Sequence, residues 1–129
     1  MQWIEPQLLI ADDDTDFRET LSEVFHRRGY RTVLVGDGCE ALEIVRSQTK
    51  LHLVMLDLHM PKLTGLEALQ EIRRLPVPQL PCILMSAQLN DSIVAQASKI
   101  NSTSILSKPF TLSKLTGVVD DIFHRHYGW

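Results

Sequence analysis

Short apolar runs of strand length alternate along the chain with longer segments in which apolar residues recur every three or four positions. Continuous apolar runs are typical of parallel strands that are buried on both faces. They predict strands at QLLIA (7–11), YRTVLVG (30–36), LHLVMLDL (51–58), CILMSA (82–87) and TSILSK (103–108). Because a helical segment follows each run, the pattern predicts an α/β fold with a parallel sheet and helices on both faces.

The helical segments carry their own start and stop signals. The first one holds apolar residues at helical spacing before a stop at Gly29, namely Phe17, Leu21, Val24 and Phe25. Asp14 or Thr15 is predicted to begin this helix, because short polar side chains cap helix N-termini. Further helices are expected over 39–47, 65–75, 91–100 and 112–126, and Asn101 is expected to take the left-handed cap after the fourth.

Composition narrows the range of functions. The 129 residues predict one domain over 1–129, with 44% hydrophobic and 22% charged residues, as in ordinary globular proteins. The net charge of -3 gives no basic face for nucleic acid, and no apolar run approaches the roughly 20 residues that span a membrane. Cys39 and Cys82 show no metal-ligand spacing, so we expect a small core thiol at Cys82 and a cytoplasmic location.

Polar residues with a common chemistry stand where the predicted strands end. Asp12 and Asp13 follow the first strand, Asp57 ends the third, Ser86 ends the fourth and Lys108 ends the fifth. Parallel α/β sheets bind ligands at this carboxyl edge. Carboxylate oxygens suit Mg2+, which would also relieve the repulsion among the aspartates. Asp57 has the chemistry of a phosphoryl acceptor, and the other groups would neutralise the phosphoryl oxygens.

On these residues the chain resembles the receiver domain of two-component response regulators, over nearly its whole length. The resemblance rests on LLIADDD, VMLDLHMPKLTG, ILMSA and SKPF, in that order and each at a strand end. It implies a flavodoxin-like (βα)5 fold with strand order 2-1-3-4-5. It also implies a phosphorelay switch that promotes only its own phosphorylation and dephosphorylation, either as a stand-alone regulator or as the receiver of a longer protein.

The resemblance assigns roles to single residues. Asp57 would accept a phosphoryl group from the phosphohistidine of a sensor kinase or a phosphotransfer protein, Lys108 would pair with the phosphate, and Ser86 would sense it. The implied Mg2+ ligands are Asp13, Asp57 and the backbone carbonyl of His59, with Asp12 acting mainly through metal-bound water.

Further positions would tune or transmit the signal. The side chains of His59 and Gln88 would set the lifetime of the phosphoaspartate, although an exposed loop histidine is an equal reading of His59. The Lys108–Pro109 peptide is expected to be cis. Helix 91–100, strand 103–108 and helix 112–126 would form the face for an output domain or target. Ile105 and Asn101–Ser102 replace the family's usual aromatic and Gly-Ala, which puts the aromatic-rotation switch in doubt.

Three other functions compete with this interpretation. A degenerate receiver would act only as a binding module, but the intact acidic, hydroxyl and lysine set argues against it. A phosphatase or phosphomutase would normally carry a second aspartate two residues after the nucleophile, where this chain has His59. A flavin site is disfavoured because the acidic loop after the first strand would repel the cofactor phosphate.

Overall fold

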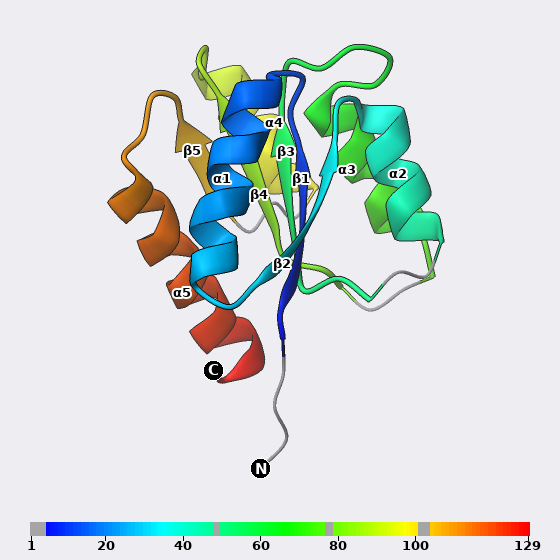
Figure 1. Ribbon diagram of the computed structural model, residues 1–129. Helices are drawn as coiled ribbons and strands as arrows, with labels where there is room; N and C mark the ends of the chain where they lie inside the picture. Colours follow the sequence, from blue (N-terminus) through cyan, green and yellow to red (C-terminus); the bar gives the residue numbers. More distant parts are fainter. Residues whose placement is uncertain (1–4, 48–49, 77–78, 101–103) are drawn as a thin grey trace.

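The computed structural model describes residues 5–47, 50–76, 79–100 and 104–129 and contains five strands that alternate with five helices (Figure 1). The strands are β1 (Gln7–Ala11), β2 (Arg31–Val35), β3 (Leu53–Asp57), β4 (Cys82–Ser86) and β5 (Ser104–Ser107). The helices are α1 (Thr15–Arg27), α2 (Gly38–Arg46), α3 (Gly65–Arg74), α4 (Asp91–Lys99) and α5 (Leu112–Tyr127). No helix in these ranges is both long and apolar enough to span a membrane.

The five strands form one parallel sheet in the order β2-β1-β3-β4-β5, which confirms the predicted topology. From β1 the chain passes first to β2 on one side and then to β3 on the other. The loops that follow β1 and β3 therefore part at the carboxyl edge, drawn at the top of Figure 1. This divergence is the position at which α/β sheets of this kind bind ligands.

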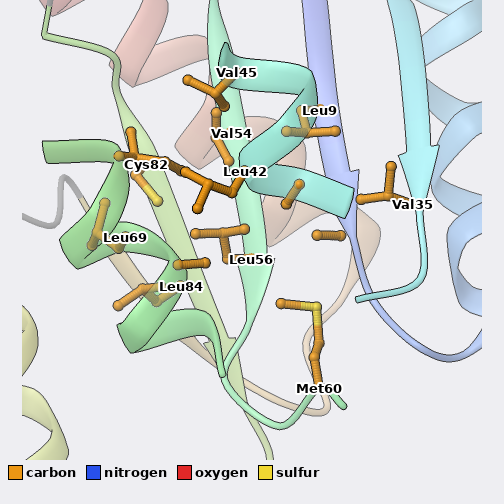
Figure 2. Close-up of a cluster of buried hydrophobic side chains, with 14 of the residues drawn as sticks. Leu9, Val35, Leu42, Val45, Val54, Leu56, Met60, Leu69, Cys82 and Leu84 are labelled. Carbon is orange, nitrogen blue, oxygen red and sulfur yellow. The ribbon is translucent and has the colours of Figure 1, made fainter. Parts of the chain in front are cut away.

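Alternate strand residues point to opposite faces of the sheet and build two separate cores. On one face Leu9, Val54, Leu56 and Leu84 pack against α2 and α3, as Figure 2 shows with their partners Leu42, Val45 and Leu69. On the other face Leu8, Ile10, Met55 and Ile83 pack against Leu21 and Phe25 of α1 and Val119 and Phe123 of α5. Both faces of the sheet are covered, as the continuously apolar strands predict.

Short polar side chains begin every helix by accepting a backbone N–H from its first turn. The capping residues are Asp14, Asp37, Thr64, Asn90 and Thr111. The Asp14 cap confirms the predicted start of α1, and Gly29 follows that helix with a positive φ of 86°. The predicted cap at Asn101 lies outside the described residues.

The two cysteines lie in different environments. Cys39 is exposed in the first turn of α2, whereas Cys82 is buried in β4. Burial raises the pKa of the Cys82 thiol to about 12, so this thiol stays protonated and unreactive at neutral pH.

Candidate functional site

Three carboxylates meet at the carboxyl edge of the sheet. Asp12 and Asp13 directly follow β1, and Asp57 is the last residue of β3. One oxygen from each lies within 4.8 Å of the others. Asp12 and Asp57 are buried, with 0% and 6% of their surface exposed, whereas Asp13 reaches solvent. This arrangement offers a hard cation several oxygen ligands and an open side for water, which is the coordination that Mg2+ favours.

Lys108 balances part of this negative charge. Its Nζ lies 2.7 Å from Oδ2 of Asp12 and 3.3 Å from Oδ2 of Asp57. Burial opposes the charged ammonium, but the hydrogen bonds and charges of these two carboxylates outweigh it and raise the pKa of Lys108. The Phe17 ring lies 4.3 Å from the same Nζ, so a cation–π contact also holds the ammonium in place.

The pKa of Asp57 lies above its ordinary value. Burial raises its pKa, and the charge of Asp12 acts in the same direction. The backbone N–H of His59, which donates to Asp57 Oδ1 at 3.1 Å, and the ammonium of Lys108 oppose this change without cancelling it. Among the described residues, Lys108 pairs with two of the three carboxylates, and the cluster retains excess negative charge. A divalent cation would neutralise that excess, so the donor set fits Mg2+.

Ser86 is the last residue of β4 and is fully buried. Its Oγ accepts the backbone N–H of Gln88 at 2.9 Å and lies 3.2 Å from Nε2 of His59. His59 is an exposed loop histidine, as one interpretation of the sequence expects. Its ring also contacts Ser86, as the other interpretation requires. Gln88 contacts Ser86 through its backbone, and its residue is exposed.

The loop between β3 and α3 closes tightly behind Asp57. A Cβ on Gly65 would lie 2.5 Å from the backbone oxygen of Asp57, so only glycine fits there. The N–H of Gly65 donates to the carbonyl of Leu58 at 3.2 Å. Lys62 adopts a left-handed backbone with φ of 69°, which is unusual for a residue with a side chain. The loop that carries His59 thus returns to the backbone of Asp57 and Leu58 at its end.

Two supporting residues escaped the sequence analysis. Arg18, on α1, donates from Nη1 to the backbone carbonyl of Asp12 at 2.6 Å. Phe17 contacts Lys108 and packs edge-on against Phe110, with ring centroids 5.9 Å apart. Both follow the acidic run directly, but helical spacing alone marks Phe17 as a core residue and Arg18 as a surface residue. Their contacts depend on how α1 sits on the sheet.

The positions expected to transmit a signal lie on β5 and just after it. Ile105, on β5, pairs with Leu84 of β4 and is half-buried against the core that α2 and α3 cover. Lys108 donates its backbone N–H to the carbonyl of Ser86 at 2.8 Å, which joins the ends of β4 and β5. The Lys108–Pro109 peptide is cis, as the resemblance implies.

Comparisons with known proteins agree with this geometry. The model of the response regulator receiver domain family matches residues 8–120. The probable chemotaxis protein CheY of Rhizobium etli is 31% identical over 119 residues, which cover 91% of this chain and 92% of that protein. The receiver domain of the Francisella response regulator 1452 has a TM-score of 0.86 at 28% identity and covers 94% of this chain and 98% of its own.

Some relatives are much longer than this chain. The transcriptional activator protein PfeR of Pseudomonas aeruginosa is 35% identical over 120 residues, which cover 93% of this chain but 38% of that protein. The similarity to such proteins therefore covers only one part of them. The activity of their remaining residues cannot be transferred to this chain.

Proposed function

The chain belongs to the response regulator receiver domain family, and from this membership we propose that Asp57 accepts a phosphoryl group from a phosphohistidine. The donor would be a sensor histidine kinase or a histidine phosphotransfer protein. The observation that carries the proposal is the convergence of a buried Asp57 with Asp12, Asp13, Ser86 and Lys108 at the ends of four strands.

The chain's own residues supply most of what the transfer needs. Asp13, Asp57 and the carbonyl of His59 would hold Mg2+ directly, and Asp12 would hold it mainly through water. When bound, the cation neutralises charge on the acid cluster and on the phosphoryl oxygens. A carboxylate oxygen of Asp57 forms the new O–P bond while the P–N bond of the donor breaks, and the departing imidazole nitrogen keeps the electron pair.

After transfer, the groups around Asp57 would exchange partners. Lys108, which pairs with Asp12 and Asp57 in the described state, would turn its ammonium to the phosphoryl oxygens. The Ser86 hydroxyl would leave its contact with His59 and donate to the phosphate. Because Gln88 N–H is bound to the same hydroxyl, movement of Ser86 would be passed to the loop over 87–91 and to the start of α4.

This coupling would transmit phosphorylation to the output face without the rotation of an aromatic side chain. Ile105 is β-branched and half-buried, so its side chain has little rotamer freedom. We expect the face of α4, β5 and α5 to respond through the loop over 87–91, and to contact an output domain or target protein. In NMR spectra with the phosphate mimic beryllofluoride, that loop should shift more than the Ile105 methyl groups; the reverse would make Ile105 the switch.

The proposed role is regulatory and not that of a separate enzyme. The reaction would be limited to the protein's own phosphorylation and dephosphorylation, with His59 and Gln88 adjusting the lifetime of the phosphoaspartate. The protein would act in the cytoplasm through protein partners, and this domain would contact neither nucleic acid nor membrane directly.

Intact mass after incubation with a small phosphodonor and Mg2+ tests the proposal. We expect the mass gain of one phosphoryl group, its loss in Asp57→Asn, and its loss when the metal is chelated. Asp16→Asn makes the same chemical change in the first turn of α1, outside the acid cluster, and should leave phosphorylation intact. Equal phosphorylation of Asp57→Asn and the wild type would refute the assignment of Asp57.

A further inference from the structure

The segment Gly36–Gly38 runs from the end of β2 into the first residue of α2 and places no side chain in the acid cluster. It lies against Arg18, which binds the loop after β1, and against the loop after β3. We propose that this segment positions the Mg2+ site: Gly36 acts through Arg18 on the loop after β1, and Asp37 and Gly38 act on the loop after β3. The inference rests on the proposed function, because it concerns the same metal site. It assigns a role to the end of β2, a strand that places no residue in the candidate site.

The loop after β1 is tied to the end of β2 through both backbone groups of Asp12. The N–H of Asp12 donates to the carbonyl of Val35 at 3.1 Å, and its carbonyl accepts Nη1 of Arg18 at 2.6 Å. A Cβ on Gly36 would lie 3.0 Å from that same Nη1, closer than side chains normally pack. The absence of a side chain at Gly36 therefore leaves the space in which the Arg18 guanidinium reaches Asp12.

Arg18 is held in this position from a second side. Its Nη2 donates to Oγ1 of Thr15 at 3.3 Å, so the guanidinium bridges the start of α1 and the end of β1. The arginine thereby fixes the backbone from which the Asp12 and Asp13 carboxylates project. The Arg18 guanidinium also brings a positive charge to the loop that bears two of the three carboxylates.

The loop after β3 is held by the first turn of α2. A Cβ on Gly38 would overlap the carbonyl oxygen of Leu63 and lie 2.6 Å from the Leu63 Cβ. Next to it, the buried Asp37 accepts the N–H of Glu40 at 2.8 Å and lies 3.5 Å from Nζ of Lys62. These contacts fall on consecutive loop residues, one of which has the unusual positive φ.

The supported loop includes the group that would bind the metal through its backbone. His59 lies three residues before Lys62, and its N–H already donates to Asp57 Oδ1 at 3.1 Å. Displacing Leu63 by a side chain at Gly38 would therefore move the loop on which the His59 carbonyl is placed. The glycine contact should matter more than the ion pair, because the Lys62 side chain is 66% exposed and its charge is screened by solvent.

Mg2+ titration of the metal-free protein by calorimetry tests the positioning role. Residues that orient metal ligands typically change affinity by about 10-fold or more when replaced. We expect Gly38→Ala to raise the Kd for Mg2+ by about 10-fold. Gly36→Ala should raise it less, because the atom that its Cβ would crowd, Nη1 of Arg18, is the end of a flexible side chain. Gly117→Ala is the matched control, because a Cβ at this exposed α5 glycine would meet nothing within 4 Å. It should leave the Kd unchanged.

A second background separates positioning from general loss of stability. In Arg18→Met the atom that a Cβ at Gly36 would crowd is gone, so adding Gly36→Ala should raise the Kd no further. A purely structural role would instead lower the thermal stability of Gly36→Ala in both backgrounds and leave the Kd unchanged. The amide resonance of His59 gives an independent readout, and we expect Gly38→Ala to shift it in the metal-free protein whereas Gly117→Ala does not.

Lys62→Met keeps the inference testable if Gly38→Ala fails to fold. We expect a smaller rise in Kd than for the glycine variants, and no change for Lys114→Met, which alters an exposed lysine on α5. Folded Gly36→Ala and Lys62→Met proteins with the wild-type Kd would overturn the inference while leaving the proposed function standing. A wild-type protein that binds no Mg2+ would overturn the proposed function and this inference together.

Discussion

The two ends of the same sheet are built in opposite ways. At the carboxyl edge, two buried aspartates repel each other, and a lysine pairs with both of them. Burial there raises the pKa of Asp57. At the amino edge, His52 precedes β3 and is surrounded by rings: Tyr127 lies 5.7 Å away and Trp129 5.3 Å away between centroids.

Two hydrogen bonds hold His52 at the amino edge, whereas the carboxyl edge gathers three carboxylates. The backbone N–H of Gln7 donates to Nδ1 of His52 at 3.0 Å, and the Tyr127 hydroxyl donates to the His52 carbonyl at 2.6 Å. Function and stability are thus drawn from opposite ends of shared strands. Changes at the amino edge should lower stability without altering chemistry, whereas changes at the carboxyl edge should do the reverse.

Phe123→Ala should produce the largest loss of stability. The ring is 3% exposed and contacts the rings of Tyr30, Tyr127 and Trp129. Replacing a buried phenylalanine by alanine typically costs about 3–5 kcal/mol, because it removes apolar contacts and leaves a cavity. Denaturant unfolding measures the loss, and Mg2+ affinity of the folded fraction should stay at the wild-type value. A weakened metal site would show that the two edges are not independent.

Mg2+ should stabilise the protein from the carboxyl edge. A ligand that binds only the folded state at roughly one hundred times its Kd adds about 2.7 kcal/mol. Asp13→Asn should remove most of this gain, because Asp13 is the exposed carboxylate of the cluster and a proposed direct ligand. Thermal unfolding with and without Mg2+ measures both values. An equal gain in Asp13→Asn would exclude this residue as a ligand.

The sequence predicts the carboxyl edge far better than its supports. Apolar runs mark where strands end, and a parallel sheet brings those ends to one edge. The sequence therefore identifies the site residues Asp12, Asp57, Ser86 and Lys108. Strand order itself came from the family resemblance, since alternation of strands and helices does not specify which strands are neighbours.

Long-range packing is what local patterns leave out. The Arg18 bond to the Asp12 carbonyl depends on the seating of α1, and the contact of Gly38 with Leu63 joins residues from separate β/α units. The His52 bond to Gln7 spans 45 positions of the chain. Neither periodicity nor capping encodes such pairs, so the residues that support the site were found only in the structure.

Asp57→Asn should stabilise the metal-free protein at neutral pH. The folded-state pKa of Asp57 is raised, so the folded protein binds this proton more tightly than the unfolded chain does. The resulting stabilisation is fully present below the unfolded pKa of about 3.9 and is lost as pH rises through the folded pKa, so at neutral pH the charged carboxylate is a penalty. The neutral amide removes that penalty, with a gain of about 1 kcal/mol. Asp121→Asn, at an exposed ion pair on α5, should change little. Destabilisation by Asp57→Asn would mean that its Lys108 contact outweighs burial.

Tyr127→Phe should lower stability by about 1 kcal/mol, since it removes one hydrogen bond and leaves the partly buried His52 carbonyl without its hydroxyl donor. Tyr30→Phe is the matched control, because its hydroxyl lies 3.5 Å from Asp120 at an exposed position. Denaturant unfolding compares the two losses. Equal losses would show that the Tyr127 hydroxyl contributes nothing specific to the amino edge.

The smallest effect, a pH dependence from His52, gives the sharpest contrast between the two edges. Burial lowers the pKa of His52, and the charge of Lys50 acts in the same direction. Protonation would also place a proton on Nδ1, which could then no longer accept the Gln7 N–H. The other groups against the ring, Tyr127 and Trp129, are neutral at these pH values.

The sign of the His52 effect follows from linkage. The unfolded chain binds the His52 proton more tightly than the folded protein does. The stabilisation that neutral His52 contributes is therefore fully present above the unfolded pKa of about 6.5 and is lost as pH falls through the folded pKa. The slope is therefore opposite to that of Asp57. Unfolding free energies measured across this window should decline less steeply toward low pH in His52→Gln than in the wild type. His124→Gln, at an exposed histidine of α5, should keep the wild-type slope. If His52→Gln also keeps it, His52 does not contribute to the pH dependence of stability.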